Sequence, residues 1–535
     1  SGAIKEPLNI SEESFKGREI IKKRLTPIKV GLLGYRTVPA NHKDNKLLYL
    51  CNQILSNESK TGLLDQLIIN NDIMDVGSID LDYVDHGGII FYFIPKLFFQ
   101  SFKKAELLLM NSINNLKEGN FSEDLLDAIK LSAIRSHEEG IENMERRLYS
   151  LFDLFINEES WEQTLSFPEQ IKSLKKADIV EVANQYFNND YLVMHSKMGF
   201  PKKHKLQKPP YKPMTPKNVE SKSEFAKSLE SINEEILDIE YINFGEDVKY
   251  SDISSNVHFY YTNNPINNIF SLVFKYGIGN IENPKLNKTA ELLNMLGTYQ
   301  LSHNDFKMKL QQIGTSLKFS SNIDYFTIEL KGFDEYLDES IVLLNEFINN
   351  VNPDKRKIKQ LILSAKSERK MEKKDPGIKG KALRDYAAYG ENSYYLSRLT
   401  PKQIKKIGVE GFINEFKSAL NYELDIMYIG NVGFSDVKYS IKNNLELSKN
   451  FKKSNSPIYR EIQSFNHNTI YILDDQKAVQ SQVYFNIIGS INNNKDRAIA
   501  NAFNKYFGTG MGSIIFQEIR EFRSLAYACG ARYKV

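Results

Sequence analysis

A long internal repeat limits the folds that this chain of 535 residues can adopt. The triplet Leu131-Ser132-Ala133 recurs as Leu363-Ser364-Ala365, each time inside a pattern rich in Lys, Glu and Arg that predicts a helix. The run Pro168-Glu169-Gln170-Ile171-Lys172 recurs as Pro401-Lys402-Gln403-Ile404-Lys405, and the two separations differ by one residue. Self-similarity at a fixed spacing indicates that the chain uses one supersecondary unit more than once.

Both copies begin and end on predicted strands. Val30–Pro39 and Ile269–Gly277 open them, and each opening strand is followed by a polar turn and a helix with apolar periodicity. The apolar runs Tyr191–Met194 and Leu424–Ile429 close them. The pattern predicts an α+β fold of tandem homologous units, each an antiparallel sheet packed with helices.

A third copy begins near the C-terminal end of the sequence. Gln482–Gly489 is its predicted opening strand, and Lys495-Asp496-Arg497 then matches Lys43-Asp44-Asn45 of the first copy. The other two copies continue for much longer beyond the equivalent point. We therefore expect two complete units and a third that is truncated at Val535, with the full protein extending further.

A linker rich in proline and lysine separates the two complete units. Residues 201–218 hold five prolines interleaved with lysines, a composition that favours extended, semi-rigid chain and predicts a hinge. An acidic, helix-like stretch, Lys222–Ile239, follows it. The alternative function for the basic run is a binding patch for a polyanion.

The predicted domains are an N-terminal extension (1–27), a first unit (28–200), the linker and acidic helix (201–250), a second unit (251–440) and a truncated third unit (441–535).

Charge and composition exclude several classes of protein. A formal net charge of +3 gives no electrostatic footprint for nucleic acid or anionic lipid. The longest apolar runs fall far below the ~18 residues that a membrane-spanning helix needs. Cys51 and Cys529 are the only cysteines, so no disulfide framework or cysteine-rich zinc cluster can form. We therefore expect no nucleic-acid partner and no membrane span.

The eight histidines predict no metal site, because no two of them stand at metal-ligand spacing on one helix. His137-Glu138-Glu139 is the only His-Glu cluster, and it lacks the second His of H-E-x-x-H or H-x-x-E-H. Together with Arg135, Glu142 and Arg146 it reads as the polar face of a helix. We expect no catalytic residue and no metal ligand in this chain.

The most distinctive segment is the glycine turn at 510–513 with the run Glu518-Ile519-Arg520-Glu521-Phe522-Arg523-Ser524-Leu525-Ala526-Tyr527. The pattern predicts a helix over Ile514–Arg523 that leads into a strand at Leu525–Tyr527. It resembles the E-I-R-E-x-R-x-L-A-Y pattern that opens the last domain of insulinase- or pitrilysin-type (inverzincin) zinc metallopeptidases. The resemblance extends over nearly the whole chain. Residues 28–200 are similar to the second domain of the long single-chain bacterial members, residues 251–440 to the third, and residues 441–535 to the start of the fourth.

The resemblance implies substrate-binding roles for Arg520 and Tyr527, whose spacing matches a family pair that reaches the substrate near the scissile bond. A guanidinium can hold a peptide carbonyl or carboxylate, and a phenol can donate to a developing oxyanion. The family binds Zn²⁺ through H-x-x-E-H and a distal Glu in its first domain. This chain has no such motif. Zn²⁺ is thus expected for the full-length enzyme and not for this chain alone.

Two functions follow from the resemblance. In the first, the chain is part of a bacterial zinc metalloendopeptidase that degrades peptides or unfolded proteins in an enclosed chamber, in the periplasm or cell envelope, together with a missing N-terminal catalytic domain. In the alternative, it is a non-catalytic partner or scaffold subunit of the same fold that binds peptides or a catalytic partner. An H-x-x-E-H before Ser1 would favour the enzyme. A transport or adhesion module unrelated to proteolysis requires the match at Arg520 and Tyr527 to be coincidental.

The linker composition gives a testable expectation. Residues 201–218 carry little apolar surface to anchor them, so limited trypsin digestion should first cleave between Lys202 and Lys217. Mass spectrometry of the early fragments measures the position of the cut. Lasting resistance of this segment would mean that it is packed against other parts of the protein.

Overall fold

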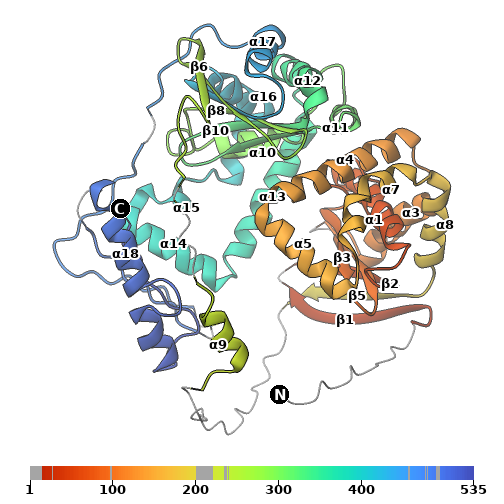
Figure 1. Ribbon diagram of the computed structural model, residues 1–535, viewed down its shortest axis with the longest axis horizontal. Helices are drawn as coiled ribbons and strands as arrows, with labels where there is room; N and C mark the ends of the chain where they lie inside the picture. Colours follow the sequence, from red (N-terminus) through yellow and green to blue (C-terminus); the bar gives the residue numbers. More distant parts are fainter. Residues whose placement is uncertain are drawn as a thin grey trace. The chain divides into compact units, whose positions relative to one another are not determined.

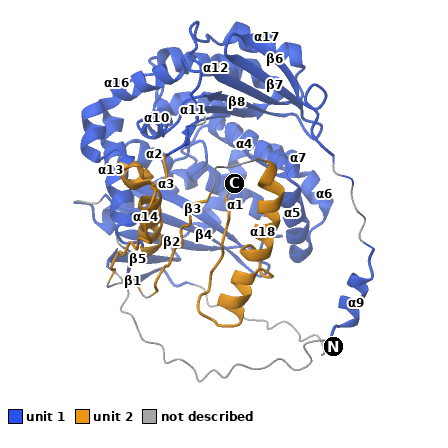
Figure 2. Cartoon of the chain, turned by 90° about the vertical axis from the view of Figure 1, so that its left-hand side faces the viewer, with its two compact units in different colours: residues 1–375, 397–460 blue, residues 376–396, 461–535 orange. Residues whose placement is uncertain are grey.

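A computed structural model describes residues 15–26, 28–96, 99–199, 221–233, 238, 240–455, 458–475, 478, 480–489 and 494–534. The chain divides into two compact units (Figure 2). Unit 1 comprises residues 1–375 and 397–460, and unit 2 comprises residues 376–396 and 461–535. The predicted linker at 201–218 lies outside the described residues. Of the acidic stretch 222–239, the structure describes one short helix, α9 (Glu224–Glu230).

The first sheet of unit 1 has five strands in the order β1-β5-β2-β4-β3. The predicted opening and closing strands of the first repeat are its central pair, β2 and β5, which run antiparallel. β1 pairs in parallel with β5, so part of the predicted N-terminal extension belongs to the sheet. The strands are β1 (Arg18–Thr26), β2 (Val30–Thr37), β3 (Asp75–Asp82), β4 (Gly87–Ile94) and β5 (Tyr191–Met198).

The second sheet repeats this order with one added edge strand, β6-β7-β11-β8-β10-β9. The opening strand β8 again lies antiparallel to the closing strand β11, and β7 again pairs in parallel with the closing strand. The α+β class and the repeated unit predicted from the sequence are thus confirmed in the strand order. The strands are β6 (Lys249–Ser254), β7 (Val257–Asn263), β8 (Ile269–Tyr276), β9 (Ser316–Ser321), β10 (Phe326–Phe333) and β11 (Leu424–Gly430).

Alternating side chains set which face of each sheet is buried. In β4, Ile89, Phe91 and Phe93 are buried and alternate with half-buried residues, as a strand with one covered face requires. Gly31 on the neighbouring β2 leaves room for the Phe93 ring, which a Cβ at that position would overlap. Each sheet therefore packs its covered face against its own helices around one apolar core.

The helices of each repeat match the predicted segments (Figure 1). The repeated triplets lie in α4 and α13, and the repeated Pro-initiated runs lie in α7 and α16. The first repeat has α1 (Asn45–Leu55), α2 (Asp65–Ile69), α3 (Phe102–Lys117), α4 (Glu123–Glu142), α5 (Met144–Asn157), α6 (Trp161–Leu165), α7 (Phe167–Ser173) and α8 (Lys176–Tyr186). The second has α10 (Leu286–Leu293), α11 (His303–Gln312), α12 (Leu337–Asn350), α13 (Lys355–Glu372), α16 (Pro401–Ala419) and α17 (Phe434–Asn444).

A buried arginine joins the two repeats within unit 1. Arg135 of α4 is 6% exposed and donates through Nη1 to the carbonyl oxygens of Gly314, at 2.8 Å, and Lys331, at 3.3 Å. Its Nε lies 3.1 Å from Glu139, and the second oxygen of Glu139 lies 3.2 Å from Lys331 Nζ. The predicted polar face of α4 is therefore in part a buried interface. Further bonds between the repeats are Thr61–Gln311, Gln66–Asn304, Asn264–Glu142, Asn267–Glu138 and Lys357–Ile69.

Unit 2 departs from the sequence predictions at its strands. Gln482–Gly489 forms no strand, and its apolar side chains Phe485 and Ile487 are 91% and 90% exposed. A strand is stable only with a neighbour to complete its ladder, and no strand in the described part of unit 2 pairs with this segment. Leu525–Tyr527 is likewise irregular and exposed. The described helices of unit 2 are α14 (Pro376–Tyr389), α15 (Tyr394–Ser397, at its boundary), α18 (Arg497–Phe507) and a π-helix, η4 (Phe516–Glu521).

Within the described ranges, no helix is both long and apolar enough to cross a lipid bilayer.

The Arg135 contacts generate a stability prediction. Arg135→Met should destabilise unit 1 by about 3 kcal/mol or more, because the carbonyl oxygens of Gly314 and Lys331 lose their buried donor and Glu139 loses its charged partner. Urea denaturation followed by circular dichroism measures the loss. Arg146→Met, at an exposed position of α5, serves as the control and should stay within about 0.5 kcal/mol. Equal stability of the two variants would contradict the role given to Arg135.

Candidate functional site

The two predicted substrate-binding residues lie together at one end of unit 2. Arg520 is in the π-helix, and the left-handed residue Ser524 (φ 50°) turns the chain back after it. The guanidinium carbon of Arg520 lies 4.6 Å from the centre of the Phe516 ring and 5.2 Å from that of the Tyr527 ring. Both distances fit cation–π contacts. Local structure therefore places Arg520 and Tyr527, which are seven positions apart in the sequence, next to each other.

The Arg520–Tyr527 pair remains accessible. Tyr527 is 85% exposed, and its hydroxyl has no hydrogen-bond partner among the described residues. Within the described residues, Arg520 pairs with its neighbour Glu521 at 3.7 Å, a separation at which an exposed ion pair is weak. The predicted helix over Ile514–Arg523 ends earlier, at Glu521. The pair can thus offer a cation and a phenol to a polar ligand.

A second candidate site is a polar pocket in the first repeat, which the sequence analysis did not identify. It has a volume of about 380 Å³ and lies where α1, β3, β4 and α4 meet, with Gln311 from the second repeat in its wall. Tyr49 and Asn52 come from α1, Asp80 from β3, and Arg135 from α4. Because these residues are scattered through the sequence and Gln311 comes from the other repeat, no local motif marks the pocket.

The charges of this pocket are unbalanced. Its two cations are engaged elsewhere, since Lys60 pairs with buried Asp65 and Arg135 pairs with Glu139. Its two acids, Glu58 and Asp80, have no cationic partner among the described residues. Burial is the main cause that raises the pKa of Asp80, and the nearby charge of Asp82 adds to it, although hydrogen bonds from Asn52 oppose the shift. The pocket therefore favours a positively charged ligand.

Asn52 holds Asp80 in place. Its side-chain nitrogen donates to both carboxylate oxygens, at 2.8 and 2.7 Å. Asn52 is 3% exposed, and within the part of the chain that the structure describes its Oδ1 has no hydrogen-bond partner. An unsatisfied buried carbonyl costs free energy unless it gains a donor. An N–H group entering the pocket could supply that donor.

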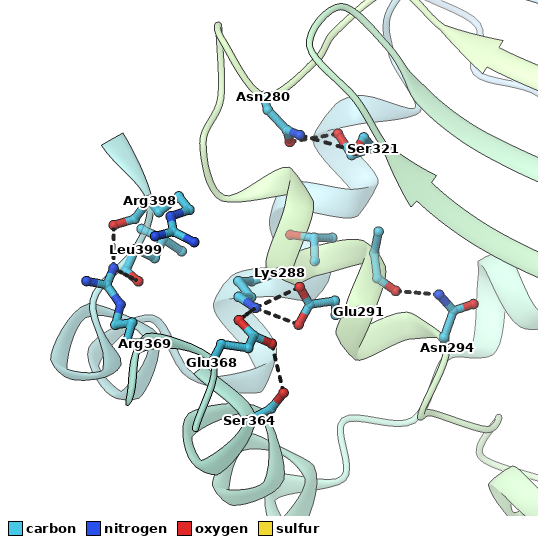
Figure 3. A network of polar contacts seen from close by, with 12 residues as sticks. Asn280, Lys288, Glu291, Asn294, Ser321, Ser364, Glu368, Arg369, Arg398 and Leu399 are labelled. Atoms are coloured by element: carbon cyan, nitrogen blue, oxygen red, sulfur yellow. Dashed lines mark hydrogen bonds and ion pairs between the residues drawn. The ribbon is translucent and has the colours of Figure 1, made fainter. Parts of the chain in front are cut away.

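The same position in the second repeat is closed by an ion-pair network (Figure 3). Lys288 and Glu291 of α10 follow the start of β8 by the same number of residues as Tyr49 and Asn52 follow the start of β2. Lys288 Nζ donates to both oxygens of Glu291, at 2.7 Å each, and to Glu368 of α13 at 3.3 Å. Ser364, the repeat counterpart of the pocket residue Ser132, donates to Glu368. The two repeats thus share a fold but differ in what lies between these helices.

The histidines of the described residues do not gather. No group of three His, Cys, Asp or Glu side chains in those ranges could hold a metal ion. His137 stacks on Phe167, with ring centres 4.8 Å apart, and burial lowers its pKa. His204 lies outside the described residues. The residues present do not fit a zinc site.

The comparisons with known proteins point to one family. Residues 410–535 match the family model described as the peptidase M16 inactive domain. No curated protein matches. Among solved structures, the chain is similar to the periplasmic protease PqqL from Escherichia coli (12% identity, TM-score 0.36), covering 86% of this chain and 54% of that one.

Two further solved structures are similar at low identity. Pitrilysin is 15% identical with a TM-score of 0.42, and the match covers 79% of this chain and 47% of that one. A peptidase M16 inactive domain from Pseudomonas fluorescens is 14% identical with a TM-score of 0.40, covering 52% and 69%. This chain thus spans about half the length of PqqL and of pitrilysin. The matched residues 410–535 include the segment Glu518–Tyr527 that carried the resemblance, so the resemblance to insulinase-type, or peptidase M16, proteins is confirmed over this part of the chain.

Proposed function

We propose that this chain supplies the peptide-binding surface of an insulinase-type zinc metalloendopeptidase that degrades peptides or unfolded proteins in an enclosed chamber. The observation that carries the proposal is the first-repeat pocket, whose acids have no cationic partner in the part of the chain that the structure describes. Zinc, which supplies a Lewis acid and an activated water in this family, belongs to a first domain with H-x-x-E-H, because this sequence has no such motif.

The pocket binds a positively charged group of the peptide, either its amino terminus or a lysine side chain. Asp80 supplies the opposite charge, and the Oδ1 of Asn52 supplies an acceptor for an N–H. An ammonium group carries three donors, so one group can serve both residues. Such a contact holds one point of the peptide while the rest of it stays extended for cleavage.

Arg520 and Tyr527 bind the peptide at a second point. Arg520 offers its guanidinium to a peptide carbonyl or a carboxylate, and the stacking of its plane on Phe516 and Tyr527 leaves the N–H groups at its edge available. The Tyr527 hydroxyl donates to an oxygen of the substrate. The cell envelope is the compartment that we propose by analogy with the periplasmic relative.

A non-catalytic partner subunit of the same fold is the second candidate. The match to a model of an inactive domain favours it, because such a domain need not share a chain with a zinc site. Both functions require peptide binding by this chain. Only the first function predicts that the full protein hydrolyses peptides and that a metal chelator abolishes this hydrolysis.

Peptide binding at the pocket can be tested by fluorescence anisotropy with the 535-residue chain. A peptide with a free amino terminus and a lysine should bind at least about tenfold more tightly than the same peptide with both amines acetylated, because acetylation removes the charge that pairs with Asp80. Asp80→Asn should abolish most of this difference.

Asp82→Asn is the matched control, since Asp82 lies on the same strand and is exposed like Asp80 but does not line the pocket. It should retain the preference for free amines. The pocket assignment is wrong if Asp80→Asn and Asp82→Asn behave alike, or if acetylation leaves the affinity unchanged.

The Arg520–Tyr527 contact is tested in the full-length protein, with peptide hydrolysis as the readout. Arg520→Ala or Tyr527→Phe should lower kcat/KM by about tenfold or more, which is about 1.4 kcal/mol of transition-state stabilisation. The melting temperature should change little, because both side chains lie at the surface of unit 2.

Arg523→Ala provides the control for this pair. Arg523 lies three residues after Arg520, is exposed and pairs with Glu518, so its loss should leave kcat/KM within about twofold. If Arg520→Ala and Arg523→Ala reduce turnover equally, or only in proportion to lost folded protein, the pair has a structural role.

A further inference from the structure

One histidine of the second sheet stands between two carboxylates. His258 of β7 places Nδ1 2.8 Å from Asp252 of β6 and Nε2 3.3 Å from Glu423, which precedes β11. Its side chain is 26% exposed, so water reaches it but does not surround it. Neutral imidazole carries one N–H and can donate to only one of these acids, whereas imidazolium donates to both.

Glu423 also holds the last segment of unit 1 that precedes residues 461–535. Its second oxygen accepts from the backbone N–H of Ser454, at 2.9 Å, while its own N–H donates to the carbonyl of Lys452 at 2.7 Å. Ser454 in turn donates to the Gly277 carbonyl at 2.9 Å, and Gly277 has no side chain to block this approach. The side chain of Glu423 therefore docks Ser454, while the Lys452 N–H donates to the Asn421 carbonyl and the Phe451 carbonyl accepts from Asn256.

We infer that His258 and Glu423 form a pH-dependent clasp, in which protonated His258 orients Glu423 to dock residues 451–455 on the second sheet. When His258 is neutral and Nδ1–H donates to Asp252, the lone pair on Nε2 faces the carboxylate of Glu423. This repulsion moves Glu423 away and weakens its bond to Ser454. The clasp thus controls how firmly residues 451–455, which lead along the chain toward residues 461–535, are held on the second sheet.

The charges around His258 support its protonation. Burial of the ring lowers the pKa of His258, but hydrogen bonds to Asp252 and Glu423 outweigh this effect and raise it above the usual value. A raised pKa means that the stabilisation is complete below the unfolded-state value of about 6.5 and is lost as pH rises through the folded-state pKa. The titratable groups facing His258 are Tyr250 and Asp252 of β6, Tyr260 of β7, Glu423, Asp425 of β11 and, through Asp252, Lys438 of α17.

Hydrogen–deuterium exchange of the 535-residue chain tests the clasp. Between about pH 5.5 and about pH 8.5, the protection of residues 451–455, corrected for intrinsic exchange, should fall severalfold, because neutral His258 no longer holds Glu423 against Ser454. The hairpin β9–β10, at the opposite edge of the same sheet from β6, should keep its protection over the same range. Protection of residues 451–455 that is flat with pH would overturn the proposal.

Two substitutions of one residue separate the clasp from a merely structural contact. Glu423→Gln can donate to neutral Nε2 and still accept from Ser454, so residues 451–455 should stay protected at high pH. Glu423→Ala should lose protection at every pH. His86→Gln, in the turn before β4, should leave the fall with pH unchanged. A Glu423→Gln variant that shows the same fall as the unsubstituted chain contradicts the mechanism.

Discussion

The buried guanidinium of Arg135 is the interaction on which the architecture of unit 1 depends. It reaches from the first repeat into the turn at Gly314 and the strand at Lys331, where it donates to the carbonyl oxygens of both residues. Desolvating such a charge is costly unless every donor direction is used. Arg135 also forms part of the pocket wall, with Gln311 beside it. The pocket therefore exists in its observed shape only while the two repeats are docked.

The two repeats have the same strand order but different polar side chains between their helices. Their strand orders agree, so the difference between them lies in a few side chains at matched positions. Between α10 and α13, Lys288 pairs with Glu291 and Glu368. Between α1 and α4, Asn52 stands at the position of Glu291, and Asp80 has no cationic partner among the described residues. A positively charged ligand can pair with Asp80, whereas Glu291 and Glu368 already share the cation of Lys288.

The sequence predicted what depends on local pattern. The apolar runs at β2, β5, β8 and β11 and the repeated helix starts led to the correct class and repeat, because each of these signals lies within about ten residues of the chain. The pocket and the Arg135 interface could not be predicted, since their members come from distant parts of the sequence, such as Thr61 and Gln311, 250 residues apart, and Arg135 and Lys331, 196 residues apart. The strand predicted at Gln482–Gly489 is wrong, because a local pattern does not show whether a second strand is present to pair with it. Its local pattern is sound, but a strand requires a partner, and Phe485 and Ile487 remain exposed.

These differences separate two kinds of candidate site. The Arg520–Tyr527 pair is held by cation–π contacts and backbone turns inside one short segment, so it forms without any sheet. Its geometry should therefore survive changes elsewhere in the chain. The pocket has the opposite dependence, because its wall is assembled from both repeats and from Arg135. Loosening the contact between the repeats should weaken ligand binding at the pocket while leaving the contacts of Arg520 intact. The two sites can thus respond independently to a change in the arrangement of the repeats.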